Sequence, residues 1–432
     1  MAETALSVII CGRVAGTLRQ DSRGLMSFSY SGDYSGAPLS LSMPVSNRVF
    51  GQSTVRPYLF GLLPDSEQQR RAIANEHGIS ANNPVAMLER IGLDCPGAVQ
   101  FCPCGQEASA TARNEEFVPL ADREIAQRLR SIRSDRDATW MGSEESWSLG
   151  GNQGKFALAL RDGSWYECRG AAPTTHIFKN GVAGFKLEAL NEYVSMRTAK
   201  ACGIEAADVE YRLFEDEPAL IVSRYDRVGM PDGGIDRLHQ EDLCQSLGVM
   251  PDQKYTSDGG PAAHDVIGLL ARTGQARANL ALFTRMLFFN CLIGAPDAHA
   301  KNYSLLLGVD GNALLAPLYD VASGLAYENA RRRGRLAMSV GGENRFGRVG
   351  RGAIERYAGR NDVKVARAMD GAGLDADACA AIMAELAQAI PDAMTGVFDE
   401  SIDGGIPGTD ELRERLLGPV KENCAATLAL LG

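Results

Sequence analysis

The sequence predicts an α+β protein in which a small β-rich amino-terminal part is followed by a mixed middle and an all-helical carboxy-terminal part. Met26, Phe28 and Tyr30 alternate with serine, which is the period-two pattern of a half-buried strand. Leu412 and Leu416 lie four residues apart, so that both fall on one face of a helix near the carboxy terminus. With 432 residues, 45% hydrophobic and 23% charged, the chain is long enough for two or three subdomains with a large core.

The order of these patterns along the chain suggests where the domains begin and end. A second alternating run at residues 39–43 predicts another strand, and an apolar run at 58–63 begins a helical region. Small polar residues at 105–116 form the best linker candidate, and a helical pattern at 125–132 follows them. The predicted domains are residues 1–105, 106–230 and 231–432.

The charge balance limits the classes of partner that the chain is expected to bind. A formal net charge of −10 argues against broad binding to nucleic acid or to anionic membranes. The balance reverses only locally, where nine arginines face Glu343 and Glu355. These are Arg331, Arg332, Arg333, Arg335, Arg345, Arg348, Arg351, Arg356 and Arg360. A solvated arginine face is the first interpretation, and contact with DNA phosphates or with an acidic partner is the alternative.

Cysteine and histidine usage indicates a reducing compartment and no zinc site. The ten cysteines show no paired or zinc-knuckle spacing, and the five histidines form no His-Glu-x-x-His pair. The amino terminus lacks a basic region, and the apolar run at residues 6–11 is too short for a signal peptide. No apolar run approaches membrane-spanning length, so we expect a cytoplasmic protein without a membrane partner.

Three oxygen-bearing side chains stand at the intervals that phosphoryl transfer requires. Asn302 lies five residues after Asp297, and Asp320 lies eighteen residues further on. Protein kinases place a catalytic Asp, an Asn and a metal-binding Asp in this order. Asp297 could accept the proton of a hydroxyl, while Asn302 and Asp320 could hold Mg²⁺. On spacing alone, an accidental pattern with Asp297 capping a turn explains these residues equally well.

The predicted elements place Asp297 in a loop. An apolar helix face at residues 280–287 runs into Gly294, Ala295 and Pro296, which break the helix. Residues 305–307 and 313–315 then form a short predicted hairpin that leads toward Asp320. A catalytic loop, a hairpin and a metal-binding Asp follow one another in kinases as well.

A glycine-rich turn at residues 148–155 adds a second feature. Glycines let backbone N–H groups approach phosphate oxygens, and Lys155 adds a positive charge. The turn is not a Walker A loop, because Leu149 stands where the first Gly belongs and Phe156 replaces the Ser or Thr. The apolar run at 156–160 predicts a strand, which makes the turn a strand–turn–strand lid or an ordinary hairpin.

The chain between the turn and Asp297 supplies a lysine, a helix glutamate and a hinge. Lys179 ends a β-branched run and could reach phosphates, and Glu188 or Glu192 on the next predicted helix could pair with it. Residues 220–227 predict a buried strand that passes into a polar hinge, where adenine could hang from the backbone at Ser223 to Tyr225. Each residue alone could be an ordinary strand end. Their order predicts a two-lobed protein-kinase-like fold with ATP between the lobes.

With these motifs in hand, the chain resembles the HipA family of bacterial toxin kinases. The motifs are SLGGNQGK at 148–155, THIFK at 175–179, RYDR at 224–227, RLHQED at 237–242, KY at 254–255, GAPDAHAKN at 294–302 and PLYDV at 317–321. Upstream, FGLLP at 60–64 and GLDCPGA at 92–98 resemble the amino-terminal subdomain of that family. The combination is specific, and it covers nearly the whole chain.

The resemblance implies a role for each matching residue. Asp297 would be the catalytic base, Asn302 and Asp320 would bind Mg²⁺, and Ser148 would be the serine whose autophosphorylation expels the loop, with Ser146 as a second or alternative phosphosite. The ATP ligands would be Gly150, Gly151, Asn152, Gln153, Gly154, Lys155, Lys179, Ser223, Arg224, Tyr225, His299, Lys301, Asn302, Tyr319 and Asp320. Ser223 departs from the family, whose best-known members carry Glu at this position.

The resemblance also implies a function and partners. The chain would be a serine/threonine kinase toxin of a type II toxin–antitoxin pair that phosphorylates an aminoacyl-tRNA synthetase and arrests growth in a persister-like state. Its antitoxin would be a HipB-like helix-turn-helix repressor, and operator DNA would be reached only through that antitoxin. A small-molecule phosphotransferase and a non-catalytic co-repressor remain alternatives, since both are compatible with this set of side chains.

Overall fold

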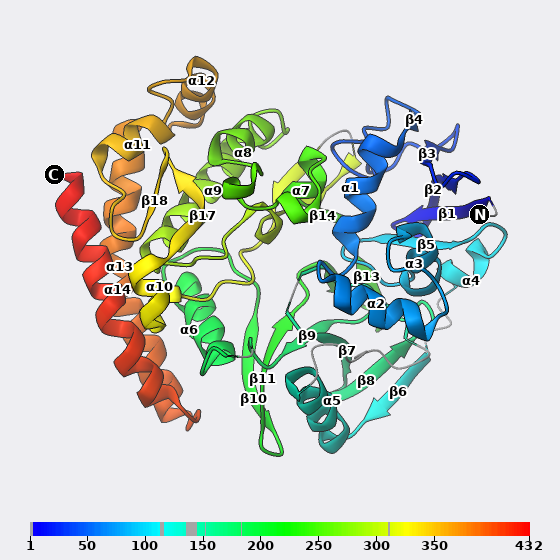
Figure 1. Ribbon diagram of the computed structural model, residues 1–432, viewed down its shortest axis with the longest axis horizontal. Helices are drawn as coiled ribbons and strands as arrows, with labels where there is room; N and C mark the ends of the chain where they lie inside the picture. The colour runs from blue at the N-terminus through cyan, green and yellow to red at the C-terminus, as the bar shows by residue number, and fades with distance from the viewer. Residues whose placement is uncertain (1–2, 113–115, 135–144, 152, 183, 310–311) are drawn as a thin grey trace. The chain divides into compact units, whose positions relative to one another are not determined.

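The computed structural model describes residues 3–112, 116–134, 145–151, 153–182, 184–309 and 312–432 (Figure 1). The chain forms two compact units, each built from three separate segments. Unit 1 comprises Met1–Val182, Leu213–Asp252 and Leu305–Ala313, and unit 2 comprises Ala183–Arg212, Gln253–Ser304 and Leu314–Gly432. The three domains that the sequence suggests stay a prediction.

The first sheet of unit 1 has five strands in the order β4-β3-β2-β1-β5. These are β1 (Thr4–Ile10), β2 (Arg13–Gln20), β3 (Met26–Tyr30), β4 (Val49–Phe50) and β5 (Val99–Pro103). The helices α1 (Gln52–Leu62), α2 (Glu67–Glu76) and α3 (Pro84–Ile91) accompany it. Phe28 of β3 and Tyr58 of α1 are fully buried in one core. The predicted alternation at residues 26–30 is confirmed, because every second side chain of β3 points into this core.

Three sequence predictions in this region need correction. Residues 39–43 form no strand, because Met43 donates its N–H to the Ser40 carbonyl oxygen at 2.9 Å and closes a turn flanked by Pro38 and Pro44. The helix expected from residue 58 begins at Gln52. The linker candidate contains the short helix α4 (Glu107–Thr111).

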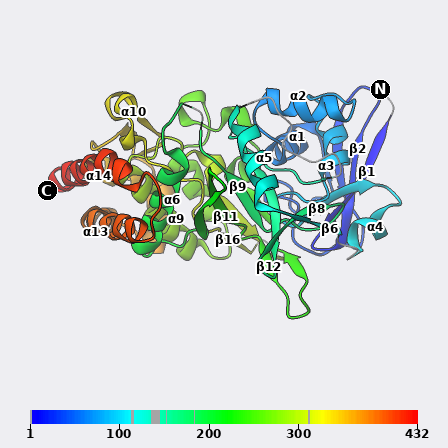
Figure 2. The same ribbon diagram turned by 90° about the horizontal axis from the view of Figure 1, so that it is seen from below.

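The second sheet has six strands in the order β10-β11-β9-β7-β8-β6. They are β6 (Glu116–Leu120), β7 (Phe156–Arg161), β8 (Ser164–Arg169), β9 (His176–Lys179), β10 (Val209–Phe214) and β11 (Glu217–Ser223). Helix α5 (Asp122–Ser134) packs on it through Ile125 and Leu129, which share a core with Phe156 and Phe178. Figure 2 shows α5 lying against these strands. The predicted strands at β7, β9 and β11 and the predicted helix at α5 are confirmed.

Short elements complete the middle of the chain. They are β12 (Arg227–Gly229), β13 (Ile235–Arg237), β14 (Gln240–Asp242), α7 (Leu243–Leu247), β15 (Ser304–Leu307) and β16 (Ala313–Leu315). Strands β15 and β16 are neighbours in one sheet, as the predicted hairpin requires. Its predicted tip, Asp310-Gly311, lies outside the described residues.

Unit 2 is mainly helical. Its helices are α6 (Glu188–Ala201), α8 (Ala263–Leu270), α9 (Ala276–Leu292), α10 (Glu328–Arg333), α11 (Arg351–Tyr357), α12 (Val363–Ala372), α13 (Ala376–Asp403) and α14 (Thr409–Leu431). The long helices α13 and α14 lie side by side (Figures 1 and 2). The small sheet β17 (Arg335–Val340) and β18 (Glu343–Arg345) is inserted before α11. The α+β class and the helical character of the carboxy-terminal region are confirmed, but this region is not all-helical, because it contains β17 and β18. None of the helices described is long and apolar enough to cross a membrane.

Candidate functional site

The Asp297 loop is closed by hydrogen bonds to its own backbone. Helix α9 ends at Leu292, and Gly294 turns the chain with a φ of +64°, a conformation that favours glycine. The His299 N–H and the Asn302 side-chain Nδ2 both donate to the Asp297 carbonyl oxygen, each at 2.8 Å. The loop therefore fixes Asn302 beside Asp297, while 62% of the Asp297 side chain stays exposed to solvent.

The Asp297 carboxylate has two aromatic neighbours from unit 2. The Tyr255 hydroxyl donates a hydrogen bond to Asp297 Oδ1, and His299 Nε2 lies 3.7 Å from the same oxygen. The two rings meet edge to face with centroids 4.8 Å apart. The sequence places Tyr255 in a family motif but gives it no role, because it stands 42 residues before Asp297. The contact restrains the carboxylate that would take a substrate proton.

Asp320 adopts a strained backbone conformation next to this loop. Its φ is +59°, in the left-handed region that residues other than glycine seldom occupy. Such strain costs about 1–3 kcal/mol and is found mainly where surrounding contacts enforce it. Here the Tyr319 hydroxyl donates to the Lys301 carbonyl oxygen at 2.9 Å and lies 2.7 Å from Ser304 Oγ. These bonds tie the Asp320 segment to the Asp297 loop.

The donor chemistry of Asn302 and Asp320 fits Mg²⁺. Because Asn302 Nδ2 is bonded to the Asp297 carbonyl, the amide oxygen Oδ1 is the atom that can serve as a ligand. Together with the Asp320 carboxylate it offers the few hard oxygens that Mg²⁺ takes alongside phosphate and water. In the described part of the chain no group of three or more His, Cys, Asp or Glu side chains gathers as a metal site. His299 and Lys301, both buried, lie in the same loop.

The glycine-rich turn of unit 1 is docked on the end of α1. The buried Ser148 hydroxyl donates to the Leu62 carbonyl oxygen at 2.6 Å. Gly151 has a φ of +99° and accepts a hydrogen bond from the Asp65 N–H at 3.1 Å. Lys155 Nζ donates to the Gly150 carbonyl oxygen at 2.7 Å and so closes the turn. Gln153 and Gly154 continue this turn, Ser146 is half-buried at its start, and Asn152 lies outside the described residues.

The proposed lysine and hinge also belong to unit 1. Lys179 ends β9, is only 5% exposed, and pairs with Leu220 of β11. Ser223 ends β11 opposite His176. The Arg224 N–H donates to the Thr175 carbonyl oxygen at 2.9 Å, and the Tyr225 hydroxyl donates to Gln240 Oε1. In unit 2, Glu192 is buried on α6 and Glu188 begins that helix.

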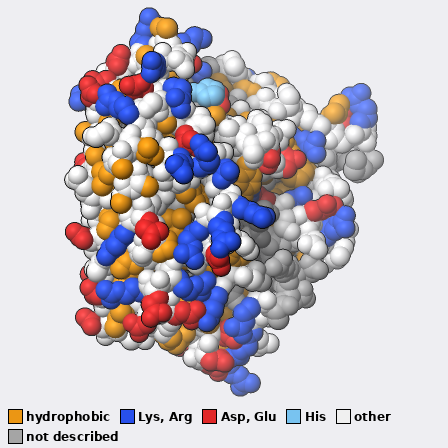
Figure 3. Space-filling view, turned by 60° about the vertical axis from the view of Figure 1, so that its left-hand side comes forward, with side chains coloured by type: hydrophobic (Ala, Val, Ile, Leu, Met, Phe, Trp, Pro, Cys, Tyr) orange, Lys and Arg blue, Asp and Glu red, His pale blue; other side chains and the backbone are white. Residues whose placement is uncertain are grey.

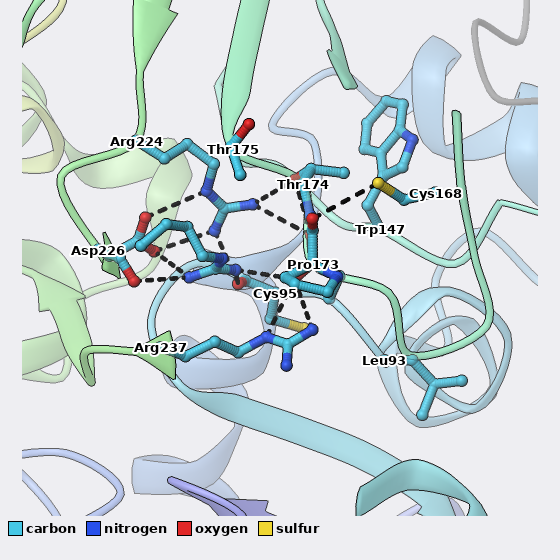
Figure 4. A network of polar contacts seen from close by, with 12 residues as sticks. Leu93, Cys95, Trp147, Cys168, Pro173, Thr174, Thr175, Arg224, Asp226 and Arg237 are labelled. Carbon is cyan, nitrogen blue, oxygen red and sulfur yellow. Dashed lines mark hydrogen bonds and ion pairs between the residues drawn. The ribbon is translucent and has the colours of Figure 1, made fainter. Parts of the chain in front are cut away.

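The guanidinium of Arg224 is engaged in a buried ion cluster rather than in an open hinge (Figure 4). It contacts Asp94 Oδ2 at 3.2 Å and Asp226 Oδ2 at 2.9 Å. The sequence could not predict this contact, because Asp94 stands 130 residues before Arg224. The Arg224 side chain is therefore already engaged within unit 1.

The arginine-rich segment carries acids close to its arginines. Arg345 pairs with Glu343 at 2.8 Å, and Arg360 pairs with Glu355 at 2.6 Å. Arg332 pairs with Glu328 of α10 at 2.6 Å. Figure 3 shows basic and acidic side chains interspersed on the face that bears the carboxy-terminal helices. Such pairing lowers the local positive field and favours the solvated interpretation.

Replacing Tyr255 by phenylalanine should lower kcat about tenfold, the size of one lost hydrogen bond to a charged group. The ring would still pack against His299, so the KM for ATP should stay unchanged. Steady-state phosphate transfer measures both constants. Tyr357→Phe, which removes a tyrosine hydroxyl of unit 2 from its partner Thr284, is the control. A raised KM with an unchanged kcat would show that Tyr255 acts on the nucleotide instead.

Comparisons with known proteins identify the family of the chain. The family model of the HipA-like C-terminal domain matches residues 147–394, and that of the HipA N-terminal domain matches residues 6–102. The kinase candidate Y4mE of Sinorhizobium fredii is 37% identical over 350 residues, which cover 79% of this chain and 82% of that protein. The serine/threonine-protein kinase toxin HipA of Shewanella oneidensis is 30% identical over 378 residues, covering 84% of this chain and 82% of the toxin.

One solved structure covers almost the entire chain. The complex of the Shewanella oneidensis toxin–antitoxin system HipA, HipB and its operator DNA contains a chain with a TM-score of 0.81 and 25% identity, with 98% of each chain covered. The fold is thus of the predicted protein-kinase-like class. The chain belongs to the HipA family, as the motifs predict.

Proposed function

We propose that the chain is an ATP-dependent serine/threonine protein kinase that acts as the toxin of a type II toxin–antitoxin pair. The observation that carries the proposal is the joining of Asp297, Asn302 and Asp320 in unit 2. Asn302 is bonded to the Asp297 backbone, and Tyr319 bonds the Asp320 segment to Lys301 of the same loop. The relative named a serine/threonine-protein kinase toxin supports the assignment.

Each side chain has a distinct task in this proposal. Asp297 accepts the proton of the substrate hydroxyl, which general-base catalysis requires within hydrogen-bond reach. Asn302 Oδ1 and the Asp320 carboxylate hold Mg²⁺, which supplies neutralising charge to the phosphates of ATP. Lys179, Lys155 and the N–H groups of the glycine-rich turn bind phosphate oxygens, with His299 and Lys301 on the phosphate side. Backbone groups from Ser223 to Tyr225 hold adenine.

The partners follow from the family. The Shewanella oneidensis relative is solved in complex with HipB and operator DNA. We therefore propose a HipB-like helix-turn-helix antitoxin for this chain, with DNA reached only through it, as the net charge of −10 favours. An aminoacyl-tRNA synthetase is the proposed protein substrate, on the family resemblance.

Incubation of the purified chain with γ-labelled ATP, Mg²⁺ and cell extract tests the reaction class. A labelled protein band that carries phosphoserine or phosphothreonine is expected. Label that appears only in a small metabolite would point to a small-molecule phosphotransferase. If calorimetry detects no binding of Mg·ATP, the chain is a non-catalytic co-repressor. Removal of Mg²⁺ with a chelator should stop the labelling in the first two cases.

A further inference from the structure

A buried ion cluster in unit 1 joins three segments that are far apart in the sequence. Asp94 lies between α3 and β5, Thr174 precedes β9, and the arginines lie at the end of β11 and in β12 and β13. The members are Asp94, Thr174, Arg224, Asp226, Arg227 and Arg237 (Figure 4). Asp94, Arg224 and Arg227 are each 2% exposed at the side chain. Buried charges in native proteins are paired, and here both aspartates are.

The Asp94 carboxylate is the centre of the cluster. Oδ2 accepts from the Thr174 hydroxyl at 2.7 Å and from Arg224 Nη1 at 3.2 Å. Oδ1 accepts from Arg227 Nη2 at 2.8 Å and from Arg237 Nη2 at 3.1 Å. Burial raises the pKa of Asp94, but the three arginines outweigh burial and hold it well below its usual range. Asp94 is therefore ionised at neutral pH.

The backbone of the same residue holds the glycine-rich turn. The Asp94 N–H donates to the Ser146 carbonyl oxygen at 3.1 Å, and the Ser148 N–H donates to the Asp94 carbonyl oxygen at 3.0 Å. Asp94 and Trp147 thus form an isolated parallel β-bridge. Trp147 is buried, and its indole N–H donates to Glu145 Oε1 at 3.1 Å. Asp94 consequently bonds the start of the turn through its main chain and the arginines near the hinge through its side chain.

We propose that Asp94 is a positioning residue that couples the docked state of the Ser148 turn to the placement of the Arg224 hinge. The proposal rests on the proposed function, since the turn and the hinge are its phosphate-binding and adenine-binding parts. Residues 92–98 would then serve nucleotide binding from the amino-terminal region of the chain. A substitution that weakens the contacts of the Asp94 carboxylate should therefore make the glycine-rich turn open more often, although no residue of the turn has been changed.

Hydrogen exchange of the full chain measures this coupling at the Ser148 amide. Thr174→Val removes the hydroxyl that donates to Asp94 and accepts from Arg224 Nη1 at 2.8 Å, with almost no change in shape, and Asp94→Asn removes the charge but keeps both backbone bonds. Both variants should speed exchange in the peptide spanning residues 145–151 about fivefold or more, at least the effect of one lost hydrogen bond. The peptide of β1 and β2 should not change. Thr284→Val, which removes a buried hydroxyl of unit 2 that is bonded to the Leu280 carbonyl oxygen and to the Tyr357 hydroxyl, is the matched control.

Steady-state kinetics distinguish a positioning role of Asp94 from a general loss of structure. Thr174→Val should raise the KM for ATP about fivefold or more and leave kcat within about twofold, by the same estimate. A fall in kcat alone, or unchanged exchange at residues 145–151, would overturn the coupling. If Asp94→Asn fails to fold, Thr174→Val decides the question. Faster exchange in a chain that binds no ATP would uphold the coupling and refute the proposed function.

Discussion

Replacing Asp297 by asparagine should reduce phosphate transfer by about 10²- to 10⁴-fold, the usual contribution of a general base. The amide can still accept the Tyr255 hydrogen bond, and the loop bonds from His299 and Asn302 go to the unchanged backbone carbonyl. The variant should therefore fold and bind Mg·ATP normally while it transfers almost no phosphate. Steady-state labelling and calorimetry on the same preparation measure the two properties.

The same substitution should relieve growth arrest in cells that express the chain. Asp399→Asn is the matched control, since Asp399 is an exposed acid of α13 that pairs only at the surface with Arg413. The control should arrest growth as the parent does. A chain with Asp297→Asn that arrests growth as strongly as the parent would show that toxicity does not come from phosphate transfer.

Replacing Ser148 by glutamate should release the glycine-rich turn and lower phosphate transfer roughly 10²-fold, as displacement of a positioning group by about an ångström can do. Ser148 is 1% exposed, and its hydroxyl points at the Leu62 carbonyl oxygen, 2.6 Å away. A carboxylate in that place would be a buried charge facing another acceptor, which costs several kcal/mol. A phosphate at Ser148 carries even more charge and should act the same way.

Two further serine variants test this account of the turn. Ser148→Ala loses one hydrogen bond, worth about 1 kcal/mol, and should keep most of the activity. Ser146→Glu is the charge-matched control. Ser146 is half-buried, and the atom that accepts the hydrogen bond from Asp94 is its backbone carbonyl oxygen, which the substitution leaves in place. Proteolysis of the turn and the KM for ATP should rise only in Ser148→Glu. Parental activity in that variant would contradict the assignment of the turn to phosphate binding.

The sequence predicts most of the elements that carry the proposed chemistry, because each has a local signal. Several features can be recognised without knowledge of the tertiary contacts. They are the period of two at residues 26–30, the helix that ends before Gly294, and the order of Lys179, the hinge and Asp297. The strand expected at 39–43 is wrong, since alternation alone does not reveal the turn between Pro38 and Pro44 that the Met43 N–H closes onto Ser40.

Long-range contacts of the candidate site could not be predicted from one sequence. Tyr255 meets Asp297 across 42 residues, and Asp94 meets Arg224 across 130. No periodicity or spacing encodes such pairs, which arise only when the chain folds. The left-handed backbone of Asp320 has no sequence signal either, and it lies beside Tyr319, whose hydroxyl bonds the distant Lys301 carbonyl oxygen.

The most direct test of the central claim is a phosphoproteomic comparison of cells that express the chain and cells that express its Asp297→Asn form. The account predicts one or a few protein serine or threonine sites that are phosphorylated only with the parent chain, an aminoacyl-tRNA synthetase among them, together with Ser148 itself. Identical phosphorylation in the two cultures would contradict the assignment of Asp297, Asn302 and Asp320 to protein phosphorylation.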